Sequence, residues 1–246
     1  MKSKKIRHSF LDNTMRKKDP IIETFSAMAS NYEEIVNAEL QQFWGWDYYS
    51  FVNTLLDLTE INEGDHILDI ATGTAVLPLM LSNNNKVVGL DITFAMLENA
   101  KVNTKNNSRI ELICGSALSL PIKSEVFDLI TCVLATHHLD MRTLLSEMKR
   151  ALKNSGSITI ADVCIPQYMR HPIPSFFLKL AAFLYFLISH GIYRAKSEAS
   201  AVSKVRTQKE WIQLADEGGF TNIEITQLTA KYAWLPGPLI MTASKL

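Results

Sequence analysis

Cysteine is scarce in this chain of 246 residues, which contains only Cys114, Cys132 and Cys164. The three are far apart, no CxxC pair occurs and their number is odd, so a disulfide framework or a thiolate zinc site is not expected. Each cysteine lies in or beside an apolar run, which is typical of a buried reduced thiol. This usage favours a cytoplasmic protein.

Glycine and proline are also few, and no net charge is present. Ten Gly and eight Pro follow no repeat, which excludes fibrous and low-complexity classes. The 25 basic and 25 acidic side chains cancel, so no overall field attracts a polyanion and a nucleic-acid partner is not expected. Since 47% of the residues are hydrophobic, the chain can form a globular core.

The N-terminus lacks the apolar stretch of a secretory signal, although it is basic. Residues 1–20 carry a net charge of +5, which leaves −5 for the remainder. We expect a basic flexible arm here, with contact to an anionic surface as the alternative. The remainder, residues 21–246, is expected to form a single domain.

Short apolar runs alternate with helical patterns from His66 onward, which predicts an α/β fold: a Rossmann-like, doubly wound, mostly parallel seven-stranded sheet. The last two strands follow each other without a helix, so we expect an antiparallel pair at one edge. The strands are predicted near 66–71, 86–91, 109–114, 126–133, 157–162, 221–228 and 238–244, with helices near 74–82, 93–104, 140–153 and 207–217.

Two segments fall outside this alternation. Residues 21–58 are helical in pattern and rich in aromatics, which predicts a helical cap. Residues 163–204 form an expected lid insertion whose run from 173 to 192 is almost entirely apolar. A membrane span here would pull the sheet apart, so we expect a buried or lid helix, with an in-plane membrane-surface helix as the alternative.

The most informative segment runs from Ile67 to Ala75, an apolar strand followed by a turn of small residues that opens a helix. Such a turn lets a ligand approach the backbone, and unpaired N–H groups at the helix start can receive an anionic group. Asp91 closes the next strand 18 residues after Gly73, where a carboxylate can accept hydrogen bonds from ribose hydroxyls. Together these features predict an adenine nucleoside site.

Five ordered motifs resemble those of class I S-adenosylmethionine-dependent methyltransferases, especially the branch that makes ubiquinone and menaquinone. The turn DIATGTA resembles D-x-G-x-G-x-G, with Ala71 and Ala75 at two glycine positions. The later matches are Asp91 with TFAML, GSA with LPI, FDLI and ATHHLD. Ser116 stands where the family has an aspartate that accepts from the adenine amino group, so we expect weakened adenine recognition.

The resemblance implies S-adenosyl-L-methionine as cofactor. Tyr32 matches an entrance motif, F-x-x-x-A-x-x-Y, in which the tyrosine covers the methionine moiety. Asp69 is expected to orient the turn and reach the ligand amino group. The full set of expected cofactor-binding residues is Tyr32, Asp69, Ala71, Thr72, Gly73, Asp91, Ile92, Met96, Ser116, Ala117 and Leu134.

His138 and His137 follow the fourth strand, where such sheets place their ligands, and are the expected catalytic residues. An oxygen or acidic carbon nucleophile needs a base, and a histidine can supply one. The alternative is that one histidine packs under the loop and the other caps the next helix. No metal is expected.

These observations predict an enzyme that methylates an oxygen or carbon of a small, lipophilic molecule. The apolar lid is the reason to expect an apolar or aromatic acceptor. Two alternatives stay open: a catalytically silent adenosyl-binding or membrane-associated scaffold protein, and an NAD-dependent dehydrogenase. Peripheral membrane contact is compatible with the sequence, and the oligomeric state is not predicted.

Overall fold

The computed structural model describes residues 7–8, 19–232 and 234–246. Most of the predicted basic arm therefore lies outside the described residues. Within it, β1 (Arg7–His8) pairs in parallel with β4. The seven predicted strands are confirmed, and this two-residue strand extends the sheet at one edge.

The sheet has the order β1-β4-β3-β2-β5-β6-β8-β7 and is parallel except at β8, which runs antiparallel to both of its neighbours. The predicted antiparallel edge pair is confirmed in β7 and β8. Because β2 lies between β3 and β5, the strand order reverses beside it, and such a switch point opens a crevice at the carboxyl ends. The strands are β2 (His66–Ile70), β3 (Lys86–Asp91), β4 (Ile110–Cys114), β5 (Phe127–Val133), β6 (Leu152–Cys164), β7 (Phe220–Gln227) and β8 (Gly237–Lys245).

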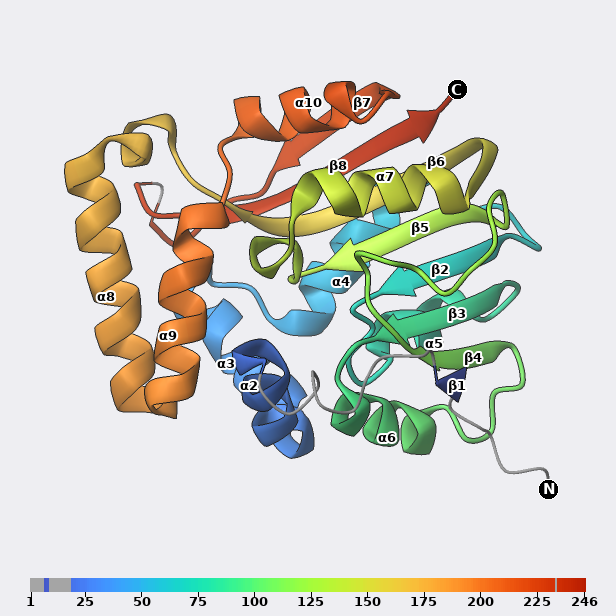
Figure 1. Ribbon diagram of the computed structural model, residues 1–246, viewed down its shortest axis with the longest axis horizontal. Helices are drawn as coiled ribbons and strands as arrows, with labels where there is room; N and C mark the ends of the chain where they lie inside the picture. Colours follow the sequence, from blue (N-terminus) through green and yellow to red (C-terminus); the bar gives the residue numbers. More distant parts are fainter. Residues whose placement is uncertain (1–6, 9–18, 233) are drawn as a thin grey trace.

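Helices cover both faces of this sheet, as its nearly continuous apolar strands require. Figure 1 shows α7 and α10 on the near face and α4 and α5 behind, while α2, α3, α8 and α9 gather beyond the carboxyl ends of β2 and β5. The helices are α2 (Pro20–Met28), α3 (Tyr32–Phe43), α4 (Tyr48–Asp57), α5 (Val76–Leu81), α6 (Phe94–Asn103), α7 (Met141–Ala151), α8 (Pro172–His190), α9 (Ile192–Ala201) and α10 (Gln208–Glu217).

Local side chains set several helix ends. Asp140 starts α7 by accepting from the Thr143 N–H, and Thr207 with Glu210 forms a reciprocal cap at α10. The predicted continuation of α7 to residue 153 is wrong, because β6 begins at Leu152. Lys153 pairs with the Asp128 carboxylate over 2.8 Å rather than with the helix carbonyls.

Of the two expectations for this segment, a buried helix is wrong, whereas a lid helix stays a prediction. α8 contains no buried residue, because only one of its sides faces protein and the other faces outward (Figure 1). It is long and apolar enough to cross a membrane by length and composition alone, which is weak evidence by itself. The helical cap over 21–58 is present as α2, α3 and α4.

Candidate active site

The turn after β2 has a backbone that normally requires glycine. Its φ angles are 58° at Ala71, 54° at Gly73 and 68° at Ala75, all in the left-handed region. Ala71 and Ala75 are the positions where the resemblance expects glycine, so the turn keeps the glycine conformation while carrying two Cβ atoms. Each costs roughly 1 kcal/mol of strain.

Asp91 connects this turn to the next strand. Its carboxylate accepts from the Gly73 N–H over 2.9 Å and from the Thr93 N–H over 2.8 Å. Burial raises the pKa of Asp91, and these backbone hydrogen bonds oppose the rise. These two hydrogen bonds fix the conformation of the turn, and Asp91 also lines the adjoining cavity.

That cavity, called the donor cavity below, has a volume of about 290 Å³. Its walls come from the carboxyl ends of β2, β3, β4 and β5 and from α2. Nine of the eleven residues expected to bind a cofactor line it, and His138 joins them. They are Tyr32, Ala71, Gly73, Asp91, Ile92, Met96, Ser116, Ala117 and Leu134.

Asp69 and Thr72 are not among the lining residues of the donor cavity. Asp69 is buried within the sheet and accepts from the Thr131 hydroxyl over 2.7 Å. Burial raises its pKa to about 7, although the Thr131 hydrogen bond lowers it. Its role toward a ligand amino group stays a prediction.

The part of the donor cavity where the resemblance places adenine is lined by the apolar side chain of Met96 and the hydroxyl of Ser116. Met96 is fully buried in α6 and provides a flat apolar wall. The Ser116 hydroxyl accepts from the Leu118 N–H over 3.2 Å, which occupies one of its lone pairs. One hydroxyl lone pair thus remains where a carboxylate would offer several.

A second cavity of about 420 Å³, called the acceptor cavity, lies under α8. It is lined by apolar and aromatic side chains of α3 and α8, among them Phe43, Ala182 and Phe186. Four residues line both cavities: Phe25, Tyr32, Leu134 and His138. The two cavities are therefore separated only by shared side chains. Leu134, which lies at this junction, has a left-handed backbone conformation with φ 54°.

His137 is fixed by a carboxylate at the end of β6. Its Nδ1 lies 2.6 Å from Oδ1 of Asp162, and its backbone N–H donates to the other oxygen over 3.1 Å. Burial disfavours the charged ring, but the Asp162 charge outweighs it and raises the pKa of His137. The same pairing overcomes burial at Asp162 and lowers its pKa to about 2. The two groups form an ion pair when His137 is protonated, and His137 lines the acceptor cavity.

His138 differs from its neighbour because it is neutral. Burial, followed by the charge of His137 with its ring centroid 4.2 Å away, lowers the pKa of His138 well below the ordinary range. Its Nε2 is buried without a hydrogen-bond partner and lies 3.8 Å from Oε1 of Glu198. His138 lines both cavities, and an unprotonated nitrogen of a neutral imidazole can accept a hydrogen bond or a proton.

His137, His138 and Glu198 could together hold a metal ion, since their ligand atoms lie within 4.8 Å of one another. However, Nε of Arg194 lies 3.6 Å from the same Glu198 oxygen that would bind the ion. A fixed cation at that position disfavours a second one.

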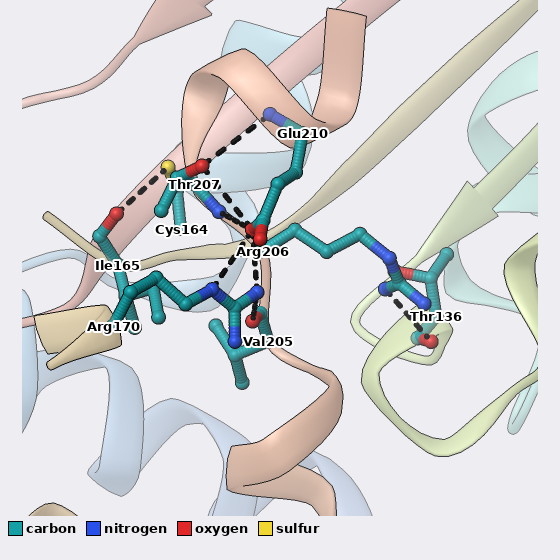
Figure 2. Close-up of polar contacts among 8 residues, drawn as sticks. All are labelled: Thr136, Cys164, Ile165, Arg170, Val205, Arg206, Thr207 and Glu210. Carbon is teal, nitrogen blue, oxygen red and sulfur yellow. Dashed lines mark hydrogen bonds and ion pairs between the residues drawn. The ribbon is translucent and has the colours of Figure 1, made fainter. Parts of the chain in front are cut away.

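The loop that carries the histidines is held by the chain beyond the lid. Figure 2 shows the Arg206 guanidinium reaching the Thr136 carbonyl, a contact of 3.4 Å, while Lys204 donates to the His138 carbonyl over 2.9 Å. The same view shows Glu210 binding both Arg170 and Thr207. These contacts tie the lid insertion to the histidine loop, so the lid and the catalytic candidates are positioned together.

Sequence reasoning missed a buried charged cluster at the acceptor cavity. Arg194 is 6% exposed, and its Nη2 donates to Oε2 of Glu39 over 2.6 Å. Its Nε and Nη1, together with Oε1 of Glu39, are buried without hydrogen-bond partners. Burial raises the pKa of Glu39 to about 7, although Arg194 opposes the rise. The only sequence signal was an arginine placed directly after a long apolar run.

Comparison with known proteins agrees with this geometry. A family model described as "Methyltransferase domain" matches residues 68–160. The chain is similar to a demethylmenaquinone methyltransferase of Thermotoga maritima, 30% identical over 170 residues, covering 66% of this chain and 72% of that protein. A demethylmenaquinone methyltransferase of Staphylococcus carnosus is 26% identical over 238 residues, covering 88% and 91% respectively.

A solved structure shares the fold. The geranyl diphosphate C-methyltransferase of Streptomyces coelicolor A3(2), in complex with S-adenosyl-L-homocysteine, superposes with a TM-score of 0.64 at 14% identity. The alignment covers 87% of this chain and 84% of that structure.

The strand order, the left-handed turn and Asp91 are those of a class I S-adenosylmethionine-dependent methyltransferase. Within this class, the chain belongs to the branch of ubiquinone and menaquinone-biosynthesis methyltransferases. It is therefore an enzyme that methylates a small molecule, and neither the silent scaffold nor the dehydrogenase is favoured.

Proposed function

We propose that this chain binds S-adenosyl-L-methionine in the donor cavity and methylates an oxygen or carbon of a lipophilic ring in the acceptor cavity. One observation carries the proposal: the two cavities share Phe25, Tyr32, Leu134 and His138 as a common wall. Methyl transfer is an in-line displacement that requires nucleophile, methyl carbon and leaving sulfur to lie in one row. Adjoining cavities supply that row.

The donor cavity fits an adenosyl ligand. The Asp91 carboxylate is available to ribose hydroxyls, and Met96 and Ile92 offer apolar surface to a purine ring. Gly73 has no side chain to fill the cavity, and the position of a Cβ there would lie 3.4 Å from the Tyr32 ring, which forms the opposite wall. When bound, the sulfonium supplies an activated methyl group, and the carbon–sulfur bond breaks as the acceptor forms its new bond.

The chain's own residues position the acceptor and take its proton. The apolar walls of α3 and α8 exclude water from the nucleophile, which removes a competing reactant. Nε2 of His138 accepts the proton that the acceptor loses, while the His137–Asp162 pair holds the adjacent ring in place. Near His138, the unpartnered Arg194 donors are placed to bind an acceptor oxygen and stabilise negative charge on it.

Because the relatives are demethylmenaquinone methyltransferases, demethylmenaquinone is the first compound to test. Calorimetry with S-adenosylmethionine, S-adenosylhomocysteine and NAD should show binding of both sulfur ligands and none of NAD. Incubation with methyl-labelled donor and demethylmenaquinone should then yield a labelled product. Failure to bind either sulfur ligand would contradict the proposal, and tight binding without product from any lipophilic extract would indicate a silent protein.

His138→Ala tests the proton acceptor. We expect turnover to fall roughly 10²-fold, because the acceptor loses its base while the donor cavity keeps its other walls. Calorimetry should show donor affinity changed by less than about threefold. His171→Ala, at an exposed position before α8, is the matched control. Unchanged turnover in His138→Ala would remove this residue from the role.

A further inference from the structure

Helix α8 presents apolar side chains on two opposite sides. Its inner side contributes Leu178, Ala182, Tyr185 and Phe186 to the acceptor cavity. A helix with one apolar face normally buries that face against the protein core. α8 uses its inner face in this way, yet its remaining surface is also apolar.

The outer side of α8 is a continuous exposed apolar stripe. Its side chains recur at spacings of three, four and seven residues, so they share one face about 120° wide at 100° per residue. Ile188 is 85% exposed, Phe176 62% and Phe177 61%. The stripe, called the outer face below, consists of Ile173, Phe176, Phe177, Leu180, Leu184, Leu187 and Ile188.

The charged side chains of the segment that carries this face are all basic, and Glu198, which follows it in α9, lies 3.6 Å from Nε of Arg194. Residues 163–197 include no Asp or Glu but four basic side chains. Arg170 pairs with Glu210 in a partly exposed contact, and buried Arg194 pairs with Glu39. Lys179 lies partly exposed on α8, and Lys196 lies exposed on α9. Anionic headgroups would therefore meet lysines and no repelling carboxylate from this segment.

Exposed aromatic residues lie near both ends of α8. Tyr168 precedes the helix and donates its hydroxyl to the Trp234 carbonyl, which places these two residues together; their exposures are 52% and 63%. Tyr193 follows the helix and is 62% exposed. Tyrosine and tryptophan favour the boundary between water and lipid because each ring is apolar with a polar edge.

We propose that the outer face of α8 docks in the plane of an anionic lipid membrane. The apolar stripe enters the acyl boundary, the lysines contact headgroups and the aromatic residues lie at the interface. α8 cannot span the bilayer in this fold, because α9 returns alongside it and its inner face closes a cavity (Figure 1). The docking itself does not depend on the proposed reaction.

Docking also has a consequence that does rest on the proposed function. The acceptor cavity lies on the opposite side of the same helix, so a lipophilic acceptor would leave the bilayer next to its binding site. In this arrangement a lipophilic molecule would pass from the bilayer to the cavity without crossing water.

Vesicle flotation tests the docking without reference to catalysis. The full chain is mixed with vesicles of phosphatidylcholine containing one quarter phosphatidylglycerol, and with vesicles of phosphatidylcholine alone. We expect strong binding to the anionic vesicles that weakens in 1 M salt and with neutral lipid. Phe177→Ser combined with Ile188→Ser should reduce binding at least about tenfold, because two apolar side chains no longer enter the lipid.

Matched variants separate this face from general stickiness. Val102→Ser combined with Ile212→Ser removes two exposed apolar side chains elsewhere and should leave binding unchanged. Lys179→Glu combined with Lys196→Glu should weaken binding to the anionic vesicles and leave binding to the neutral vesicles unchanged. The proposal is overturned if the wild-type chain does not float, or if the Phe177/Ile188 variant floats equally well. Light scattering tests whether the outer face instead joins two copies of the chain. A wild-type dimer that does not float, together with a monomeric Phe177/Ile188 variant, would also overturn the proposal.

Discussion

The backbone conformation of single residues shapes the candidate site. Ala71 and Leu134 both have a positive φ and both line the donor cavity. Side chains with a Cβ adopt this conformation only when neighbouring contacts enforce it, and such positions concentrate at functional sites. Here the strain shapes the turn and the junction of the two cavities.

Replacing Ala71 by glycine should therefore stabilise the protein. Glycine adopts φ 58° without a Cβ clash, so we expect a gain of about 1 kcal/mol. Thermal unfolding should show a rise of about 2–4 °C, and calorimetry an undiminished donor affinity. Ala199→Gly, inside α9, is the matched control and should destabilise the chain. A decrease in stability on Ala71→Gly would show that the turn is not strained.

The His137–Asp162 pair links stability to pH in two directions. Asp162 has a folded pKa of about 2 against an ordinary 3.8, so its contribution is present above pH 3.8 and is lost as pH falls toward 2. His137 has a raised folded pKa, so its contribution is full below its ordinary 6.5 and is lost as pH rises through the folded value.

Asp162→Asn should remove both effects. We expect a loss of about 3 kcal/mol at pH 6, because His137 loses its buried partner. Urea unfolding between pH 3 and 9 should show a flatter profile in the variant than in the wild type. Asp128→Asn removes a carboxylate that is one third exposed and should cost much less. A variant profile parallel to that of the wild type would contradict the ion pair.

At the scale of elements, the proposed function makes α8 the helix that decides which acceptors fit. Its inner face closes the acceptor cavity, while its outer face contributes nothing to that wall. In the proposed function, the inner side of the helix therefore contacts the acceptor, and the outer side is free to contact another surface. Arg194, near the start of α9, joins Glu39, Glu198 and the two histidines in the polar part of this largely apolar chamber.

Ala182→Trp should block this chamber. An indole in place of a methyl group would fill part of the 420 Å³ cavity, so we expect turnover to fall at least about tenfold with an unchanged donor affinity. Leu184→Trp, on the outer face of the same helix, should leave turnover in a detergent assay unchanged. Equal losses in the two variants would show that the cavity is not the acceptor site.

At the scale of the molecule, the donor cavity joins parts that are distant in sequence. Residues from α2 to the histidine loop meet around it, so a bound ligand should stabilise the whole domain. At a ligand concentration of 100 times Kd the stabilisation is about 2.7 kcal/mol. S-adenosylhomocysteine should then raise Tm by roughly 5–11 °C, and NAD should not. Differential scanning fluorimetry measures both, and equal shifts would contradict an adenosyl-sulfur site.

Sequence patterns predicted the sheet well because its strands are short apolar runs separated by turns and helices. They also located Gly73, Asp91 and His138, since a parallel sheet brings the carboxyl ends of its strands to one edge. The end of α7 was missed because Leu152 pairs with Phe127 across the sheet, a contact between distant residues that no local pattern reports.

The sequence alone determined the fold class, the family and the edge of the sheet where the donor cavity lies, because these depend on periodicity and on motifs of fixed spacing. Only the tertiary structure decided that α8 is exposed and that Arg194 and Glu39 meet beside the acceptor cavity. Those residues are 155 positions apart, and α8 carries apolar side chains on both its inner and its outer side. Hydropathy reports how apolar a segment is, but the direction each face takes depends on what the rest of the chain packs against it.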